Sequence, residues 1–138
     1  MDRKLVAQKL ENLRNCVARI ESKMPESADR LFVDLDIQDI ISVNLERAVQ
    51  NCIDIAAHLA SDLDDLGGLS AGSLFLELGG KGIIEKSLAE KLSKAVGFRN
   101  LLVHRYATIE WGRVFEKITT EMCVFRDFAL QIGKYCGL

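Results

Sequence analysis

The chain has 138 residues, of which 49% are hydrophobic and 28% charged, with 1 proline and a formal net charge of −2. This length suffices for one domain with its own core, and the composition is typical of a folded, helix-rich protein rather than a disordered one. No apolar run approaches the roughly 20 residues of a membrane-spanning helix, and the polar start MDRKLVAQKL is unlike a cleaved secretory signal. We therefore expect a single cytoplasmic domain over residues 1–138 that makes no contact with a membrane.

Two long amphipathic helices are predicted in the N-terminal half. The apolar residues of the first recur at spacings of four and three, and Pro25 ends it; they are Val6, Leu10, Leu13, Val17, Ile20 and Met24. After the connector ESADRLFVDLD, Asp36 is expected to cap the second helix, with Asp39 in its first turn and Gly67–Gly68 at its end. The apolar stripe of this helix comprises Ile41, Leu45, Ala48, Cys52, Ile55 and Leu59.

The C-terminal half predicts a short helix over SLFLELGG, a longer one over IIEKSLAEKLSKAVGFRNLLV, and a last long helix that begins after Thr108 as its N-cap. The apolar stripe of the last helix alternates four and three without a break; it comprises Trp111, Phe115, Ile118, Met122, Phe125, Ala129, Ile132 and Cys136. The pattern predicts an all-α, up-and-down bundle of four long helices and a short one. The regular stripes of the first and last helices either pack together within one chain or extend into a homodimer.

Charge is distributed unevenly along the chain. Residues 1–80 carry 8 basic and 14 acidic side chains, whereas residues 81–117 carry 8 basic and 4 acidic ones. A basic segment on an acidic chain argues against broad coating of nucleic acid, but it permits one focused anion-binding site. A solvated helix face with lysines is the alternative.

Cysteine and histidine give little support for a metal site. The four cysteines lie far apart without a C-x-x-C pair, among apolar residues of predicted helices; they are Cys16, Cys52, Cys123 and Cys136. We expect buried free thiols of a reducing cytosol. Only two histidines are present, so a Cys/His zinc site is not expected. His58 lies deep in the second helix and is expected to pack or to form a structural hydrogen bond.

The segment GFRNLLVHRY, residues 97–106, places reactive side chains at the end of a predicted helix. At about 100° per residue, Arg99 falls in the middle of the apolar stripe of Leu88, Leu92 and Leu102. A guanidinium stays charged, and its unpaired burial is costly. Arg99 therefore needs a carboxylate such as that of Asp54, a subunit interface, or an anionic ligand.

His104 and Tyr106 are less unusual by themselves. On the same wheel His104 lies about 140° from Arg99, although Gly97 could loosen the helix enough to change this. A histidine near a helix C-terminus is commonly a capping or surface residue, because the helix dipole favours its charged form there. Tyr106 is expected in the following loop, with its hydroxyl accessible to a partner enzyme.

Together these residues form the pattern R-N-x3-H-x-Y, which resembles the R-x4-6-H motif of HEPN domains and, in its extended form, the HepT toxins of HepT/MntA toxin–antitoxin systems. The resemblance covers nearly the whole chain, including FVDLDIQDIISVNLERAVQNCIDIAAHL, SLFLELGGKGII and the closing long helix. It implies a helical, homodimeric endoribonuclease that needs neither metal nor cofactor. It also implies Arg99 and His104 as the catalytic pair, Asn100 as their polar neighbour, and Tyr106 as the tyrosine that an MntA-like nucleotidyltransferase antitoxin modifies with AMP.

The residue types fit RNA cleavage by attack of a 2′-OH group. Imidazole, with a pKa near 6.5, can act as the base or the acid at neutral pH, and an arginine can stabilise the phosphate as it accumulates charge. The leading hypothesis is therefore a metal-independent endoribonuclease toxin with RNA as its substrate. A non-catalytic subunit that binds a nucleotidyltransferase and a plain helical scaffold are the alternatives.

Overall fold

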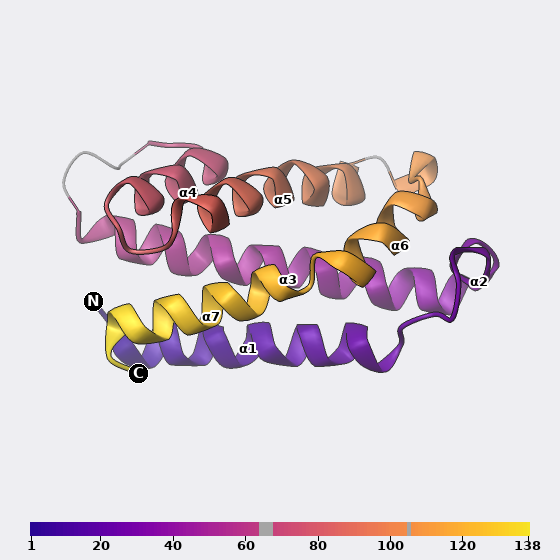
Figure 1. Ribbon diagram of the computed structural model, residues 1–138, viewed down its shortest axis with the longest axis horizontal. Coiled ribbons are helices and arrows are strands. Elements are labelled where there is room, and N and C mark those ends of the chain that lie inside the picture. Colours follow the sequence, from indigo (N-terminus) through magenta and orange to yellow (C-terminus); the bar gives the residue numbers. More distant parts are fainter. Residues whose placement is uncertain (64–67, 105) are drawn as a thin grey trace.

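The computed structural model describes residues 1–63, 68–104 and 106–138, without the side chain of Tyr106. These residues form seven α-helices and one 3-10 turn: α1 (Arg3–Ser22), α2 (Ala28–Val33), α3 (Leu35–Ser61), α4 (Ala71–Gly80), α5 (Lys86–His104), η1 (Tyr106–Thr108), α6 (Trp111–Thr120) and α7 (Cys123–Cys136). The long helices run alternately up and down, with α1, α3 and α7 side by side and α4 and α5 packed on α3 (Figure 1). The all-α, up-and-down bundle expected from the sequence is thus confirmed. Within the described ranges, no helix is both long and apolar enough to cross a membrane.

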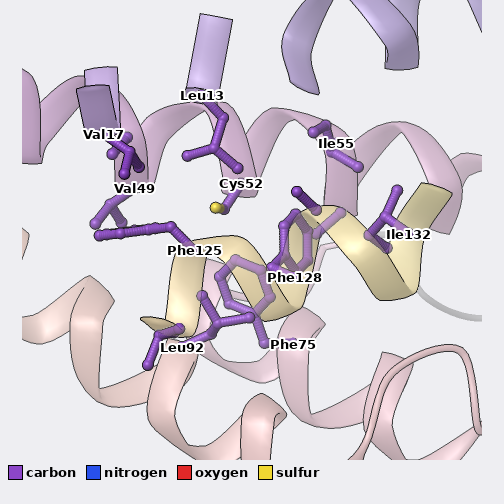
Figure 2. Packing of buried hydrophobic residues seen from close by; sticks show 14 of the residues in the cluster. Leu13, Val17, Val49, Cys52, Ile55, Phe75, Leu92, Phe125, Phe128 and Ile132 are labelled. Atoms are coloured by element: carbon purple, nitrogen blue, oxygen red, sulfur yellow. The ribbon is translucent and has the colours of Figure 1, made fainter. Parts of the chain in front are cut away.

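One continuous core fills the bundle, and the stripes read from the sequence supply most of it. The predicted apolar positions of α1 from Val6 to Ile20 are buried, as are all six predicted positions of α3. From α7, Phe125 points toward Val17 of α1 and Val49 of α3, and Phe128 points toward Phe75 of α4 (Figure 2). The Phe128 ring meets Phe75 of α4 edge to face, with centroids 5.9 Å apart. The stripes of the first and last helices therefore do pack within one chain.

The N-terminal helices begin where short polar side chains cap them. Asp2 caps α1 by accepting a hydrogen bond from the Leu5 N–H at 3.1 Å. α3 is capped by Asp34, whose carboxylate accepts from the Ile37 N–H at 3.1 Å, so the expected cap at Asp36 is wrong by two residues. The connector also contains the short helix α2, which the sequence analysis treated as loop. α3 ends at Ser61, and Gly67 of its expected end lies outside the described residues.

The predicted last helix is in fact two helices that meet at a bend. α6 ends at Thr120, and α7 begins at Cys123. The hydroxyls of Thr119 and Thr120 donate to the carbonyl oxygens of Phe115 and Glu116 at 2.7 to 3.0 Å. Such back-bonding bends helices, and α6 here points away from the axis of α7 (Figure 1) and packs against α2.

The start of α6 differs from the expectation as well. The N-cap position is Glu110 rather than Thr108, which lies in η1. Trp111 and Phe115 are only partly buried, whereas the stripe from Ile118 onward is buried. The apolar pattern thus predicted which side of α6 and of α7 faces the core, but it did not predict the bend between the two helices.

Candidate active site

α5 carries the segment that the sequence singled out, and it stays helical through Gly97 to His104. The possible loosening at Gly97 does not occur. At roughly 100° per residue, Arg99 and His104 therefore point about 140° apart around the helix axis. His104 is exposed in the last turn of α5, as the surface interpretation of this residue predicted.

Arg99 lies half-buried on the inner side of α5, beside the buried residues Leu92 and Leu102. Its Nη2 donates to the side-chain oxygen of Gln50 on α3 at 2.6 Å, and its Nη1 donates to the Asn100 side-chain oxygen at 3.1 Å. The Arg99 Nε is buried and has no hydrogen-bond partner in the described part of the chain. The guanidinium is therefore fixed through its two terminal nitrogens, while the N–H of its buried Nε has no acceptor among the described residues.

A chain of polar contacts connects Arg99 to α1 through α3. Gln50 Nε2 donates to Asp54 Oδ1 at 2.8 Å, and Lys9 Nζ of α1 lies 2.9 Å from Asp54 Oδ2. Arginine can only donate hydrogen bonds and an ionised carboxylate can only accept them. The Gln50 amide is therefore oriented with its oxygen toward Arg99 and its nitrogen toward Asp54.

This arrangement changes the expectation that a carboxylate such as that of Asp54 would pair directly with Arg99. The ion pair of Asp54 is with Lys9, and the neutral Gln50 amide stands between Asp54 and the guanidinium. Arg99 thus keeps its positive charge without a carboxylate in direct contact among these partners. Gln50 was not among the residues predicted for the site, although it lies four residues before Asp54 on one helix, the spacing at which helical side chains meet.

A pocket of about 220 Å³ borders Arg99, between α3, α5 and the bend from α6 to α7. Its charged residues include Lys91 and Lys94 of α5 and Lys117 of α6, all from the basic segment 81–117. His104 does not line this pocket. The structure thus brings Arg99 and Asn100 into contact and leaves His104 on another side of α5; Arg105 and the Tyr106 side chain lie outside the described residues.

The other candidate residues are structural or lie away from Arg99. His58 Nε2 accepts from the Asp2 N–H at 2.9 Å, so its expected structural role is confirmed. Three cysteines are buried, but Cys123 is exposed, which corrects the expectation of four buried thiols. Burial raises the pKa of the Cys52 thiol far above its ordinary value. No three Cys, His, Asp or Glu side chains within residues 1–63, 68–104 and 106–138 are grouped to hold a metal ion.

Known proteins are similar to this chain in sequence and in fold. Residues 13–132 match the family described as ribonuclease HepT-like. The chain is 28% identical over 125 residues to the mRNA nuclease HepT of Shewanella oneidensis, covering 90% of this chain and 92% of the relative. It is 30% identical over 109 residues to the tRNA nuclease HepT of Aphanizomenon flos-aquae, covering 79% of this chain and 74% of the relative.

A solved structure extends this likeness to the whole fold. The tri-AMPylated HEPN toxin of Shewanella oneidensis, in complex with its MNT antitoxin, superposes with a TM-score of 0.88 at 26% identity, covering 97% of this chain and 99% of the toxin. The resemblance stated from the motif around residues 99–106 is thereby confirmed. The chain belongs to the ribonuclease HepT-like family.

Proposed function

We propose that this chain is the endoribonuclease toxin of a toxin–antitoxin pair, with Arg99 and His104 as its catalytic residues. The observation that carries the proposal is the placement of the R-N-x3-H motif at the end of α5 of a HepT-like fold. There Arg99 is held by hydrogen bonds from two nitrogens, while His104 is exposed to an incoming strand. The two named HepT relatives are nucleases of mRNA and of tRNA, which supports RNA as the substrate.

The proposed reaction uses groups of this chain and of the RNA alone. The imidazole of His104 takes the proton of a 2′-OH, the 2′ oxygen forms a bond to the adjacent phosphorus, and the bond from phosphorus to the 5′ oxygen breaks. A protonated imidazole supplies the proton that the departing 5′ oxygen needs. The products are a 2′,3′-cyclic phosphate and a 5′-hydroxyl end. Arg99 stabilises the negative charge that accumulates on the phosphoryl oxygens.

A homodimer would complete this site. Each chain offers one histidine in the motif, whereas the reaction needs one imidazole as base and another as acid. Because Arg99 and His104 point away from each other on one helix, a two-fold arrangement of two α5 ends can bring the arginine of one copy near the histidine of the other. Asn100, bonded to Arg99 Nη1, would hold the guanidinium toward that cleft.

Tyr106 is the proposed site of silencing. Its backbone begins η1, two residues after His104, and the related toxin of known structure is AMPylated and bound to an MNT antitoxin. Transfer of AMP to the tyrosine hydroxyl would add a phosphodiester anion beside the basic motif. That anion would compete with the RNA phosphate for the same cations.

Co-expression with a nucleotidyltransferase of the MntA type should add AMP to the parent but not to Tyr106→Phe, as measured by intact-mass spectrometry. An unmodified parent in a neutralised complex would contradict this mechanism.

The activity itself is tested with the two histidines as a matched pair. Purified protein should cleave RNA in the presence of EDTA and leave 2′,3′-cyclic phosphate ends. His104→Ala should reduce the cleavage rate about 10²- to 10⁴-fold, the usual contribution of a general acid or base. His58→Ala, which removes the hydrogen bond from the Asp2 N–H far from Arg99 and His104 in the sequence, should leave the rate near that of the parent. Cleavage by His104→Ala at the parental rate would refute the assignment, and loss of cleavage with EDTA would refute a metal-independent reaction.

A further inference from the structure

The pocket beside Arg99 combines an apolar interior with a cationic border. Leu45 and Val49 reach it from α3, Met122 and Phe125 from the start of α7, and Phe98 from α5. Met122 and Phe125 are 7% and 6% exposed, and both belong to the core cluster, against which Phe98 packs. The Lys117 Nζ lies over the Phe98 ring, 5.8 Å from its centroid. Two phenyl groups and a thioether thus give the pocket an apolar, polarisable lining, which favours a planar ring system as ligand.

The border of the pocket is positive. Among the described residues, it contains Lys91, Lys94, Arg99 and Lys117 against one carboxylate, that of Glu121. That carboxylate is already paired with Lys117 Nζ at 2.7 Å. Lys91 and Lys94 are exposed and form no salt bridge within the described part of the chain. Two lysines and Arg99 thus stay available to an anion at the mouth of an apolar pocket.

Arg99 adds an observation of a different kind. Its Nε is buried and has no partner among the residues that the structure describes, while each of its two terminal nitrogens donates one hydrogen bond. Each terminal nitrogen carries two N–H groups, and these two hydrogen bonds use one on each, which leaves a second N–H on each for an oxygen of a ligand bound beside Arg99. The same side chain therefore connects the pocket with the phosphate-binding role proposed for Arg99.

We infer that this pocket binds one nucleotide, with the base against Phe98 and Phe125 and the phosphate toward Lys91, Lys94 and Arg99. The volume of about 220 Å³ lies below the roughly 300–1,000 Å³ of sites that enclose a drug-sized ligand, so a single ring system fits the dimensions better than a longer chain. Aromatic side chains beside cations are the combination with which proteins hold single-stranded nucleic acid. The inference rests on the proposed function, because the nucleotide would neighbour the scissile phosphate of the RNA.

The three methionines of the chain provide a direct test. Met122 lines the pocket, whereas Met1 and Met24 do not. In protein labelled with ¹³C at the methionine methyl groups, adenosine 5′-phosphate or cytidine 5′-phosphate should shift the Met122 signal by ring currents and leave the other two signals in place. Inorganic phosphate alone should not shift it. A 2′-O-methyl RNA trinucleotide cannot be cleaved and distinguishes two sources of the ligand. If the pocket binds a nucleotide of an RNA strand, the trinucleotide should bind more tightly than the mononucleotide. If the pocket binds a free nucleotide, the trinucleotide should bind no more tightly.

Two sets of variants measure the two halves of the site. Phe98→Leu should weaken nucleotide binding roughly 5- to 150-fold, the effect of losing one stacking aromatic ring, whereas Phe115→Leu, an equally half-buried ring outside the pocket, should not. The double variant Lys91→Gln/Lys94→Gln should weaken binding and flatten its salt dependence. Lys81→Gln/Lys86→Gln removes the same charge outside the pocket and serves as its control.

The outcomes separate the pocket from the activity. A Met122 signal that ignores nucleotides, in a preparation that cleaves RNA, would overturn the pocket inference and leave the proposed function intact. A Met122 signal that responds in a preparation that does not cleave would support the pocket and count against the nuclease. An equal shift of the Met122 signal with inorganic phosphate would overturn the inference in favour of a simple anion site. A shift that depends on protein concentration in the absence of nucleotide would overturn it in favour of contact with a second copy.

Discussion

Gln50→Leu is the substitution that tests how Arg99 is held. It removes the acceptor of the 2.6 Å bond from Arg99 Nη2 and the donor of the 2.8 Å bond to Asp54. A hydrogen bond to a charged group contributes about 1.5–3 kcal/mol, but Arg99 and Asp54 are only half-buried, so water replaces part of what is lost. We expect the free energy of unfolding to fall by about 1–3 kcal/mol, which at roughly 4 °C per kcal/mol lowers Tm by about 4–12 °C.

The catalytic consequence is measured well below that melting temperature. A guanidinium without its Gln50 partner would be misplaced, and we expect kcat/KM for RNA cleavage to fall about 10- to 100-fold. Gln8→Leu makes the same change at an exposed position of α1 and should alter stability by less than about 0.5 kcal/mol. Asp54→Asn keeps an acceptor for Gln50 and removes only the partly exposed ion pair with Lys9, which should cost about 0.2–1 kcal/mol.

Comparison of Gln50→Leu with Asp54→Asn shows which contact holds Arg99 in place. If Gln50→Leu unfolds and cleaves like the parent, the amide does not hold Arg99. If Asp54→Asn is more damaging than Gln50→Leu, the ion pair between α1 and α3 is the important contact, and the hydrogen bond to Arg99 is secondary. Chemical denaturation with urea and initial rates on one RNA substrate give both quantities for all four proteins.

Further predictions concern packing and thiols. Gly79→Ala should destabilise the fold by about 1–3 kcal/mol, because the new Cβ would lie 2.7 Å from the Ala89 Cβ. Gly80→Ala, whose new Cβ meets nothing within 4 Å, should be neutral or stabilising by up to about 1 kcal/mol. Equal urea midpoints for the two variants would contradict the close approach at Gly79. Iodoacetamide should label the exposed Cys123 rapidly and the buried Cys52 only after unfolding, and Cys123→Ser should abolish the fast phase. Because burial raises the pKa of Cys52, the folded chain keeps a proton that the unfolded chain loses above about pH 8.5. Stability should therefore fall as the pH rises above that value, by up to about 1.4 kcal/mol per unit, and the fall should be shallower in Cys52→Ala.

The fold was largely predictable because apolar spacing reports which side of a helix is buried. It does not report the direction of the helix axis, and the stripe from Ile118 to Cys136 therefore reads as continuous across a bend. Two adjacent threonines mark that bend, but a threonine hydroxyl bonds either to its own helix or to solvent, and the stripe cannot decide which. α2 was missed for a related reason: with 6 residues, it is too short to show periodicity.

The candidate site was predictable where one residue contradicted its surroundings. Arg99 stood out because a charged side chain occupied an apolar stripe, and the structure places it half-buried as that argument required. Gln50 was missed because an uncharged amide on a helix does not contradict any pattern; its importance arises only when α3 and α5 are packed together. The identity of the partner of Arg99 is thus a tertiary property, whereas its need for a partner was a property of the sequence.

The position of the chain ends determines how this molecule can be attached to surfaces, reporters or affinity tags. Both ends lie at the same end of the bundle, and α5 finishes at the opposite end (Figure 1). The N-terminal ammonium lies 3.0 Å from Asp62, so an extension there removes one ion pair. At the other terminus, Gly137 adopts φ 70° and the Leu138 N–H donates to the Gly133 carbonyl at 2.8 Å, which completes α7 before the last residue. An added sequence at the C-terminus would therefore leave the helix caps intact and project away from the end of α5.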